Sequence, residues 1–179
     1  MKPIQVIGVQ AALPLLDGLA CELARIFGVT CHVRPDSLDA EFAYDRRRGQ
    51  YHSTAILQRM QRLAAPGTRL LAVTSLDLYV PVLTFVFGEA QLEGNCALVS
   101  VHRLEEEFYG LPPRQDLLRE RLVKEAVHEL GHTFGLMHCE DWNCVMTSSH
   151  SVERVDVKSA EFCRSCLAVV KGDGRVRSV

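Results

Sequence analysis

Residues 128–138 read His-Glu-Leu-Gly-His-Thr-Phe-Gly-Leu-Met-His, and the rest of the chain is best interpreted outward from them. Side chains four residues apart share one face of a helix, so His128 and His132 can direct two imidazoles at one point. Glu129 is displaced by about 100° around the helix axis. It would therefore lie near that point without joining the histidines as a ligand, and would be placed to act on a metal-bound water.

The turn after the second histidine extends this pattern. Gly135 allows the backbone to leave the helix in a left-handed conformation, which would return His138 as a third nitrogen ligand. Three protein ligands leave one coordination position open, and a catalytic zinc ion needs such a position. The alternative is a set of ordinary surface or core histidines, because a short HExxH pattern recurs by chance. The two additional residues at fixed spacing favour zinc binding.

A helix is expected around the motif on independent grounds. Apolar side chains recur there at three- and four-residue spacing, with Asp116 as a candidate N-cap and Gly135 as the stop. The apolar stripe consists of Leu117, Leu118, Leu122, Val123, Ala126, Val127, Leu130 and Phe134. The histidines would therefore sit at the C-terminal end of a long amphipathic helix.

Four of the seven cysteines gather in the last quarter of the chain: Cys139, Cys144, Cys163 and Cys166. Two such pairs can surround one ion with four thiolates, and a site with no open position would be structural. It would pin the loop carrying His138 to the last helix. Disulfides between the same pairs are the alternative, and the absence of a secretory signal argues against them. Small core residues are expected at Cys21, Cys31 and Cys96.

Together these residues resemble the archaemetzincin family, within the metzincin clan of zinc metallopeptidases. Residues 128–138 are similar to the long zinc signature of the clan, and Met146 lies where the clan has its Met-turn. The four cysteines match the family pattern. Further similarity is found at residues 77–79, 85–88 and 99–104. The resemblance covers about half of the chain.

The resemblance implies an α/β (α+β) fold, with a twisted five-stranded mixed sheet, a backing helix, a zinc-binding helix and a small C-terminal subdomain. Leu83–Phe87 would be the antiparallel edge strand above the cleft, against which an extended substrate can pair. Met146 would form an apolar floor beneath the imidazoles, although an ordinary core methionine is equally consistent. Residues 1–179 would form one catalytic domain, with an upper part of about 1–135 and a lower part of about 136–171.

Hydrophobic patterns in the remaining sequence favour a mostly parallel sheet covered by helices. Strands are expected at 4–10, 29–33, 69–74, 83–87 and 96–102. Helices are expected at 15–27, 54–64 and 157–170, with Asp156 as the candidate cap of the last one.

The composition is that of an ordinary globular domain, with 179 residues, 47% of them hydrophobic, and a formal net charge of −2. No apolar run reaches the roughly 18 residues that cross a bilayer, and the N-terminus lacks the apolar block of a signal peptide. A cytoplasmic location without a membrane partner is therefore expected. The charge balance, and the lack of interleaved arginine and aromatic residues near Cys163, argue against nucleic-acid binding. The cluster Arg46–Arg48 is expected to lie in a solvated loop.

These observations predict an enzyme that hydrolyses peptide bonds in a peptide or protein substrate and holds two zinc ions, one catalytic and one structural. Glu129 would take a proton from a zinc-activated water and pass it to the leaving amine. One alternative replaces His138 as third ligand by Glu153 or Glu161. Another is a zinc-stabilised protein that binds peptides or partners without efficient hydrolysis. No oxyanion partner is identified, Tyr109 being a candidate by position alone, and no oligomeric state follows from the sequence.

Overall fold

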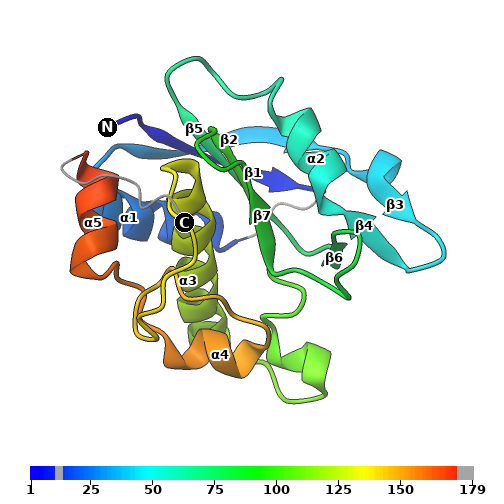
Figure 1. The fold of residues 1–179 in the computed structure, drawn as a ribbon. Coiled ribbons are helices and arrows are strands. Elements are labelled where there is room, and N and C mark those ends of the chain that lie inside the picture. Colours follow the sequence, from blue (N-terminus) through cyan, green and yellow to red (C-terminus); the bar gives the residue numbers. More distant parts are fainter. Residues whose placement is uncertain (11–13, 173–179) are drawn as a thin grey trace.

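The computed structural model describes residues 1–10 and 14–172 (Figure 1). Its main sheet has five strands in the order β2-β1-β5-β8-β7. The bounds are β1 Ile4–Val9, β2 Cys31–Leu38, β5 Arg69–Thr74, β7 Gly88–Ala90 and β8 Cys96–Ser100. The first four strands in that order pair in parallel, and β7 pairs antiparallel to β8 at one edge. The expected five-stranded mixed sheet is confirmed.

Three helices cover this sheet: α1 (Leu16–Phe27), α2 (Ser53–Met60) and α3 (Gln115–Thr133). Successive side chains of a strand point to opposite faces, so β1 contributes to two cores. Ile4 and Val6 pack with α1 and α3, whereas Ile7 and Val9 pack with α2. The helix that carries the histidines is therefore fixed against one face of the sheet, as Figure 1 shows.

A small second sheet lies beside the first and consists of β3 (Tyr44–Asp45), β4 (Gln50–His52) and β6 (Leu78–Tyr79). A short helical turn, η1 (Glu41–Ala43), precedes it. The arginine cluster forms the tip of the β3–β4 hairpin. Arg46 and Arg47 are exposed there, as expected of a solvated loop. Arg48 is exposed as well, and its guanidinium also donates hydrogen bonds to the carbonyls of Leu83 and Thr84 at 2.7 and 3.0 Å.

The edge strand of the main sheet begins later than expected. The prediction of a strand at Leu83–Phe87 is wrong, since β7 starts at Gly88. The carbonyls at the beginning of that segment accept hydrogen bonds from the side chains of Arg48 and Gln50, and are thus unavailable to a strand ladder. Val86 forms only an isolated antiparallel bridge.

The C-terminal region contains two short helices, α4 (Val152–Val157) and α5 (Arg164–Lys171). The single helix expected at 157–170 is therefore wrong. Lys158 adopts an extended backbone conformation with φ −77° and ψ 157°, which ends α4. The break frees the following backbone groups to bond the cysteine-bearing loop, as Ser159 N does with Asn143 O at 3.1 Å. Asp156 caps no helix; it lies inside α4.

The helix α3 begins two residues earlier than expected, with Arg114 instead of Asp116 at the N-cap position, so Asp116 lies in the first turn. On the side away from the sheet its buried side chains are charged. Arg121 is the central one: two of its guanidinium nitrogens donate to Asp156 at 2.7 and 2.8 Å, and a third donates to the carbonyl of Leu104 at 2.7 Å. It also pairs with Glu106 at the start of the turn η2 (Glu106–Tyr109). Arg121 thereby joins the η2 loop to α4.

Within the described part of the chain, every helix is too short or too polar to span a membrane.

Candidate metal centre

Three histidine rings meet at the C-terminal end of α3. His128 and His132 project from the helix, and Gly135, with φ +87°, reverses the chain so that His138 returns toward them. One nitrogen from each ring lies within 4.8 Å of the others. Neither alternative third ligand joins them in the described residues, because Glu153 is exposed on α4 and the Glu161 carboxylate faces Arg25 at 3.8 Å.

Hydrogen bonds to carbonyl groups orient two of these rings. His128 Nδ1 donates to Val145 O at 2.8 Å, and His132 Nδ1 donates to Leu136 O at 2.7 Å. A carbonyl can only accept, so the proton of each neutral ring is on Nδ1 and the lone pair is on Nε2. Second partners of this kind are usual for histidines that bind metals.

The spacing of the rings matches a zinc ion. The two Nε2 atoms of His128 and His132 lie 3.2 Å apart. Zinc–nitrogen bonds of 2.0–2.1 Å at tetrahedral angles separate two ligand nitrogens by about 3.3 Å. Burial lowers the pKa of all three imidazoles below the ordinary histidine value, and the positive charge of Lys158 acts in the same direction. Neutral imidazole is the form that binds a metal, so the three rings fit zinc.

The side chain of Glu129 is buried beside the rings, against the edge strand. A β-carbon placed on Gly88 would lie 2.6 Å from Glu129 Cγ and 2.8 Å from its Oε1, so the missing side chain of Gly88 leaves the room that Glu129 occupies. Burial raises the pKa of the Glu129 carboxyl well above its ordinary value, and the nearby Glu125 carboxylate adds to this effect. The strand β7 and Glu129 are thus in direct contact.

Met146 is fully buried beneath α3. A β-carbon on Gly131 would collide with Met146 Sδ and lie 3.1 Å from its Cε, so the helix backbone between the two histidines rests directly on this side chain. The residue before Met146 accepts the hydrogen bond from His128, and the carbonyl of Met146 accepts one from Cys139 N at 3.0 Å. The methionine, the histidines and the cysteine loop therefore form one continuous assembly.

The four C-terminal cysteines converge as a second cluster, and their sulfur atoms lie within 4.8 Å of one another. The Sγ atoms of Cys139 and Cys163 are 3.8 Å apart. Zinc–sulfur bonds of about 2.3 Å at tetrahedral angles give nearly this sulfur separation. All seven cysteines are unbonded, so the alternative of disulfides is not what the structure contains. Of the other three, Cys96 is buried as expected and Cys31 is half-buried. The expectation of a core residue at Cys21 is wrong, because it lies on the solvent side of α1 and is exposed.

A buried ion pair lies next to the histidines. The ammonium of Lys158 is 2.8 Å from Glu125 Oε1, and the two side chains are 1% and 4% exposed. Lys158 Nζ also donates to the carbonyl of Thr147 at 3.3 Å, one residue beyond Met146. Glu125 precedes Glu129 by one helical turn. Lys158 thus connects α3 to the turn around Met146 through a buried ion pair and a hydrogen bond.

Sequence reasoning missed Gly88, Glu125 and Lys158. The only available signal for Gly88 was a glycine after a β-type run, which is typical of a close backbone approach. Nothing in the sequence distinguishes Lys158 from an ordinary surface lysine, because its burial results from the break between α4 and α5.

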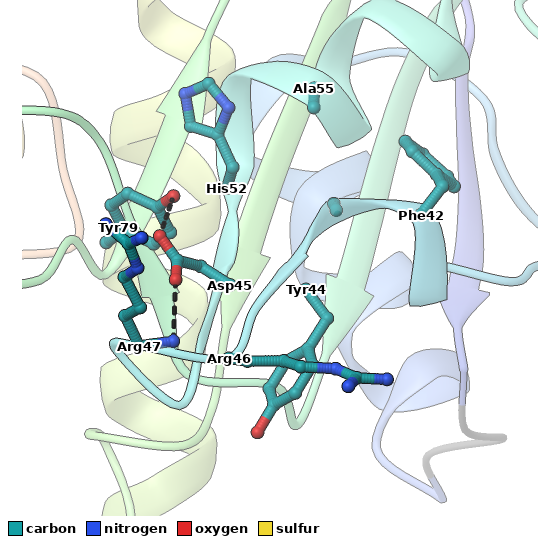
Figure 2. Close-up of a pocket in the computed structure, with 9 residues that line it drawn as sticks. Phe42, Tyr44, Asp45, Arg46, Arg47, His52, Ala55 and Tyr79 are labelled. Carbon is teal, nitrogen blue, oxygen red and sulfur yellow. Dashed lines mark hydrogen bonds between the residues drawn. The ribbon is translucent and has the colours of Figure 1, made fainter.

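A separate hollow of about 560 Å³ opens beside β3, β4 and the start of α2 (Figure 2). Aromatic and basic side chains line it, among them Tyr44, Arg46, Arg47 and His52. Its acidic residue, Asp45, accepts hydrogen bonds from Tyr79 Oη at 3.1 Å and from the backbone N–H of Arg47 at 2.8 Å, and so holds the hairpin. None of the three histidines lines this hollow, which is therefore distinct from the candidate metal centre.

A mixed sheet resting on a helix that gathers three histidines beside a buried glutamate is the arrangement of a zinc metallopeptidase, a hydrolase. The model of peptidase family M54 matches residues 30–172 of the chain. The chain belongs to this family, that of the archaemetzincins.

Relatives and solved structures agree with this assignment. The archaemetzincin of Methanocaldococcus jannaschii is 42% identical over 160 residues, covering 89% of this chain and 87% of the relative. The crystal structure of archaemetzincin from Methanopyrus kandleri superimposes with a TM-score of 0.83 at 38% identity, covering 96% of this chain and 94% of that one. Archaemetzincin from Archaeoglobus fulgidus, complexed with malonate, gives a TM-score of 0.81 at 40% identity, with coverage of 93% and 99%.

We expect Gly88→Ala to displace Glu129. The new β-carbon would also lie 2.6 Å from the backbone carbonyl of Leu98, which cannot move without disturbing the sheet. A shift of about 1 Å in a catalytic group costs on the order of 100-fold in rate. The measurement is peptidase activity per zinc-loaded chain. The control is Gly18→Ala, where a β-carbon meets nothing within 4 Å. Equal activity in the two variants would contradict the prediction.

We expect Lys158→Met to destabilise the protein by about 3–5 kcal/mol, because it leaves the Glu125 carboxylate buried without a partner. Urea unfolding of the zinc-loaded protein measures this loss. Lys124→Met is the matched control: Lys124 is 5% exposed, but its partner Glu120 is 58% exposed and stays hydrated. Similar losses in both variants would refute the role assigned to the pair.

Proposed function

We propose that the protein hydrolyses peptide bonds at the three-histidine centre, with zinc held by His128, His132 and His138. The observation that carries this proposal is the convergence of three oriented ring nitrogens next to the buried Glu129 carboxyl. Zinc supplies a Lewis acid that polarises a water molecule and the scissile carbonyl.

Glu129 is the general base in this proposal. It follows His128 directly in α3, so its carboxylate lies beside the ring nitrogens but is held apart from them by its contact with Gly88. From this position it accepts the proton of the attacking water and returns it to the leaving amine. A protein that only bound peptides would have no need of a buried carboxyl here, since burying such a group without a partner is unfavourable. This favours hydrolysis over the alternative of peptide binding alone.

The substrate is a peptide or protein that binds in extended form along β7. This strand pairs with β8 on one side, and no other strand of the described residues pairs with its second edge within the main sheet. An extended peptide can add to such an edge through backbone hydrogen bonds. The scissile carbonyl of the peptide would then face Glu129 and the three histidines, since Gly88 of β7 touches Glu129.

The four cysteines are proposed as a structural zinc site. Cys139 and Cys144 belong to the loop between His138 and Met146, while Cys163 and Cys166 lie at the start of α5. An ion between them would hold that loop to the last helix. Four free thiols persist in a reducing compartment, so we place the protein in the cytoplasm. The net charge of −2 gives no general attraction to nucleic acid.

Native mass spectrometry of protein purified without added metal or chelator should find two zinc ions per chain. Cys163→Ser should lose the ion of the cysteine site and keep that of the histidine site. His138→Ala should lose the ion of the histidine site and keep that of the cysteine site. Retention of two ions in the cysteine variant would exclude the thiolates as ligands.

Glu129→Gln should retain both zinc ions but lose activity by about 10²–10⁴-fold, the usual contribution of general acid–base catalysis. The amide has nearly the same shape as the carboxyl but cannot accept the proton. Hydrolysis of a peptide mixture by wild type and variant at equal zinc content measures this. Unchanged turnover in the variant would remove Glu129 from the mechanism.

A further inference from the structure

A strained and fully exposed turn precedes the edge strand. Val82 is completely exposed and has φ +79°, although a β-branched residue rarely adopts positive φ. It occupies the third position of a turn closed by a hydrogen bond from Leu83 N to Val80 O at 3.2 Å, where glycine or asparagine is favoured. Strain of this kind persists where the surrounding structure enforces it, and it is frequent at ligand-binding sites.

The segment that follows the turn is held firmly. The side chains of Arg48 and Gln50 donate to the carbonyls of Leu83 and Thr84 at 2.7 to 3.0 Å. The turn is thus a fixed apolar projection, with Leu83 half exposed beside Val82.

Next to the turn lies a group of stacked side chains, which we call the aromatic shelf: Phe85, Arg103, Phe108 and Tyr109. The Arg103 guanidinium lies 4.3 Å from the ring centre of Phe85 and 4.6 Å from that of Phe108. The rings of Phe108 and Tyr109 are 4.9 Å apart. Asp77 fixes Arg103 with two hydrogen bonds of 2.7 and 2.8 Å. The ring of Phe108 is nevertheless 41% exposed.

The aromatic shelf adjoins, through Phe85, the segment that leads into the edge strand. Phe85 precedes Gly88 by three residues, so the chain separates them by at most about 10 Å. Its ring contacts that of Phe87 at 5.2 Å, and both pack against the core shared with α3. Gly88 in turn touches Glu129. A peptide lying along β7 with its scissile bond near Glu129 would therefore reach the shelf within a few residues.

We propose that the aromatic shelf and the Val82 turn form a subsite for one large apolar or aromatic side chain of the peptide substrate. The inference rests on the proposed function and adds a substrate preference to it. An extended peptide is the fitting occupant because the apolar surface is continuous with the free edge of β7. The positive charge of Arg103 is already neutralised by Asp77, so the subsite offers ring faces and apolar edges rather than a net charge.

The test uses zinc-loaded Glu129→Gln protein and a mixture of random-sequence decapeptides, whose bound fraction is sequenced by mass spectrometry. Phe108→Ala is introduced into this background. Phe42→Ala is the matched control, because Phe42 is 48% exposed and also lies under an arginine, Arg59, at 4.6 Å, but it lines the separate hollow beside β3.

Bound peptides should be enriched about tenfold in phenylalanine, tyrosine, tryptophan or leucine at one position, the discrimination expected of an apolar pocket. Phe108→Ala should abolish most of this enrichment, and Phe42→Ala should leave it intact. Bound peptides without apolar enrichment, enrichment that survives Phe108→Ala, or equal loss in both variants would each overturn the proposal, as would a failure to bind any peptide.

A second variant separates the subsite from folding. Val82→Gly relieves the positive φ, so its melting temperature should equal or exceed that of the parent, while its apolar enrichment falls. A lower melting temperature together with unchanged enrichment would assign the turn a structural role only. Hydrolysis of the same mixture by the chain with Glu129 intact tests the proposed function independently. Turnover without apolar preference would refute the subsite alone, and absence of turnover would refute the proposed function.

Discussion

The hydrogen bond from His128 Nδ1 to the carbonyl of Val145 joins the helix that carries two of the three histidines to the loop that carries the third. His128 belongs to a helix fixed against the sheet, and Val145 belongs to the loop that carries Met146. The bond sets the tautomer of the ring, and with it the nitrogen that faces the centre. It also requires that the loop approach the helix closely, which Gly131 permits by having no side chain against Met146.

The close approach of the C-terminal region to α3 also buries charged side chains on that side of the helix. Arg121, Lys124 and Glu125 each have a partner in the C-terminal region or on the helix itself, so paired charges add to the apolar packing that Met146 and Val155 provide at this interface. Ion pairs and hydrogen bonds specify geometry more strictly than hydrophobic contact, which is non-directional. The proposed centre takes histidines from both sides of the interface, so a strictly defined geometry would favour its activity, since small displacements of catalytic groups are costly.

Local patterns predicted the mostly parallel sheet and the convergence of the histidines, while the antiparallel edge strand was implied by the family resemblance. The spacing of His128, His132 and His138 follows from helix geometry and one glycine, and the alternation along β1 follows from strand geometry. The start of β7 and the break at Lys158 were wrong or missed for a shared reason. Both involve contacts with residues far away in the chain, Arg48 in the first case and Asn143 in the second, and periodicity does not contain such pairings. Gly88 was missed because its role is defined by the side chain of another element.

The reversal of the chain at Gly135 also affects the order in which the two clusters can form during folding. It brings all three histidines within residues 128–138, so the chain segment closed by a metal ion there is short and its closure entropy is small. The four thiols span residues 139–166 and meet only after α5 has reached the cysteine loop. Contacts close in sequence form earlier than distant ones. Under the proposed assignment of both sites, we expect the histidine end of α3 to be able to bind its ion earlier in folding than the thiol cluster, which closes only when distant segments meet.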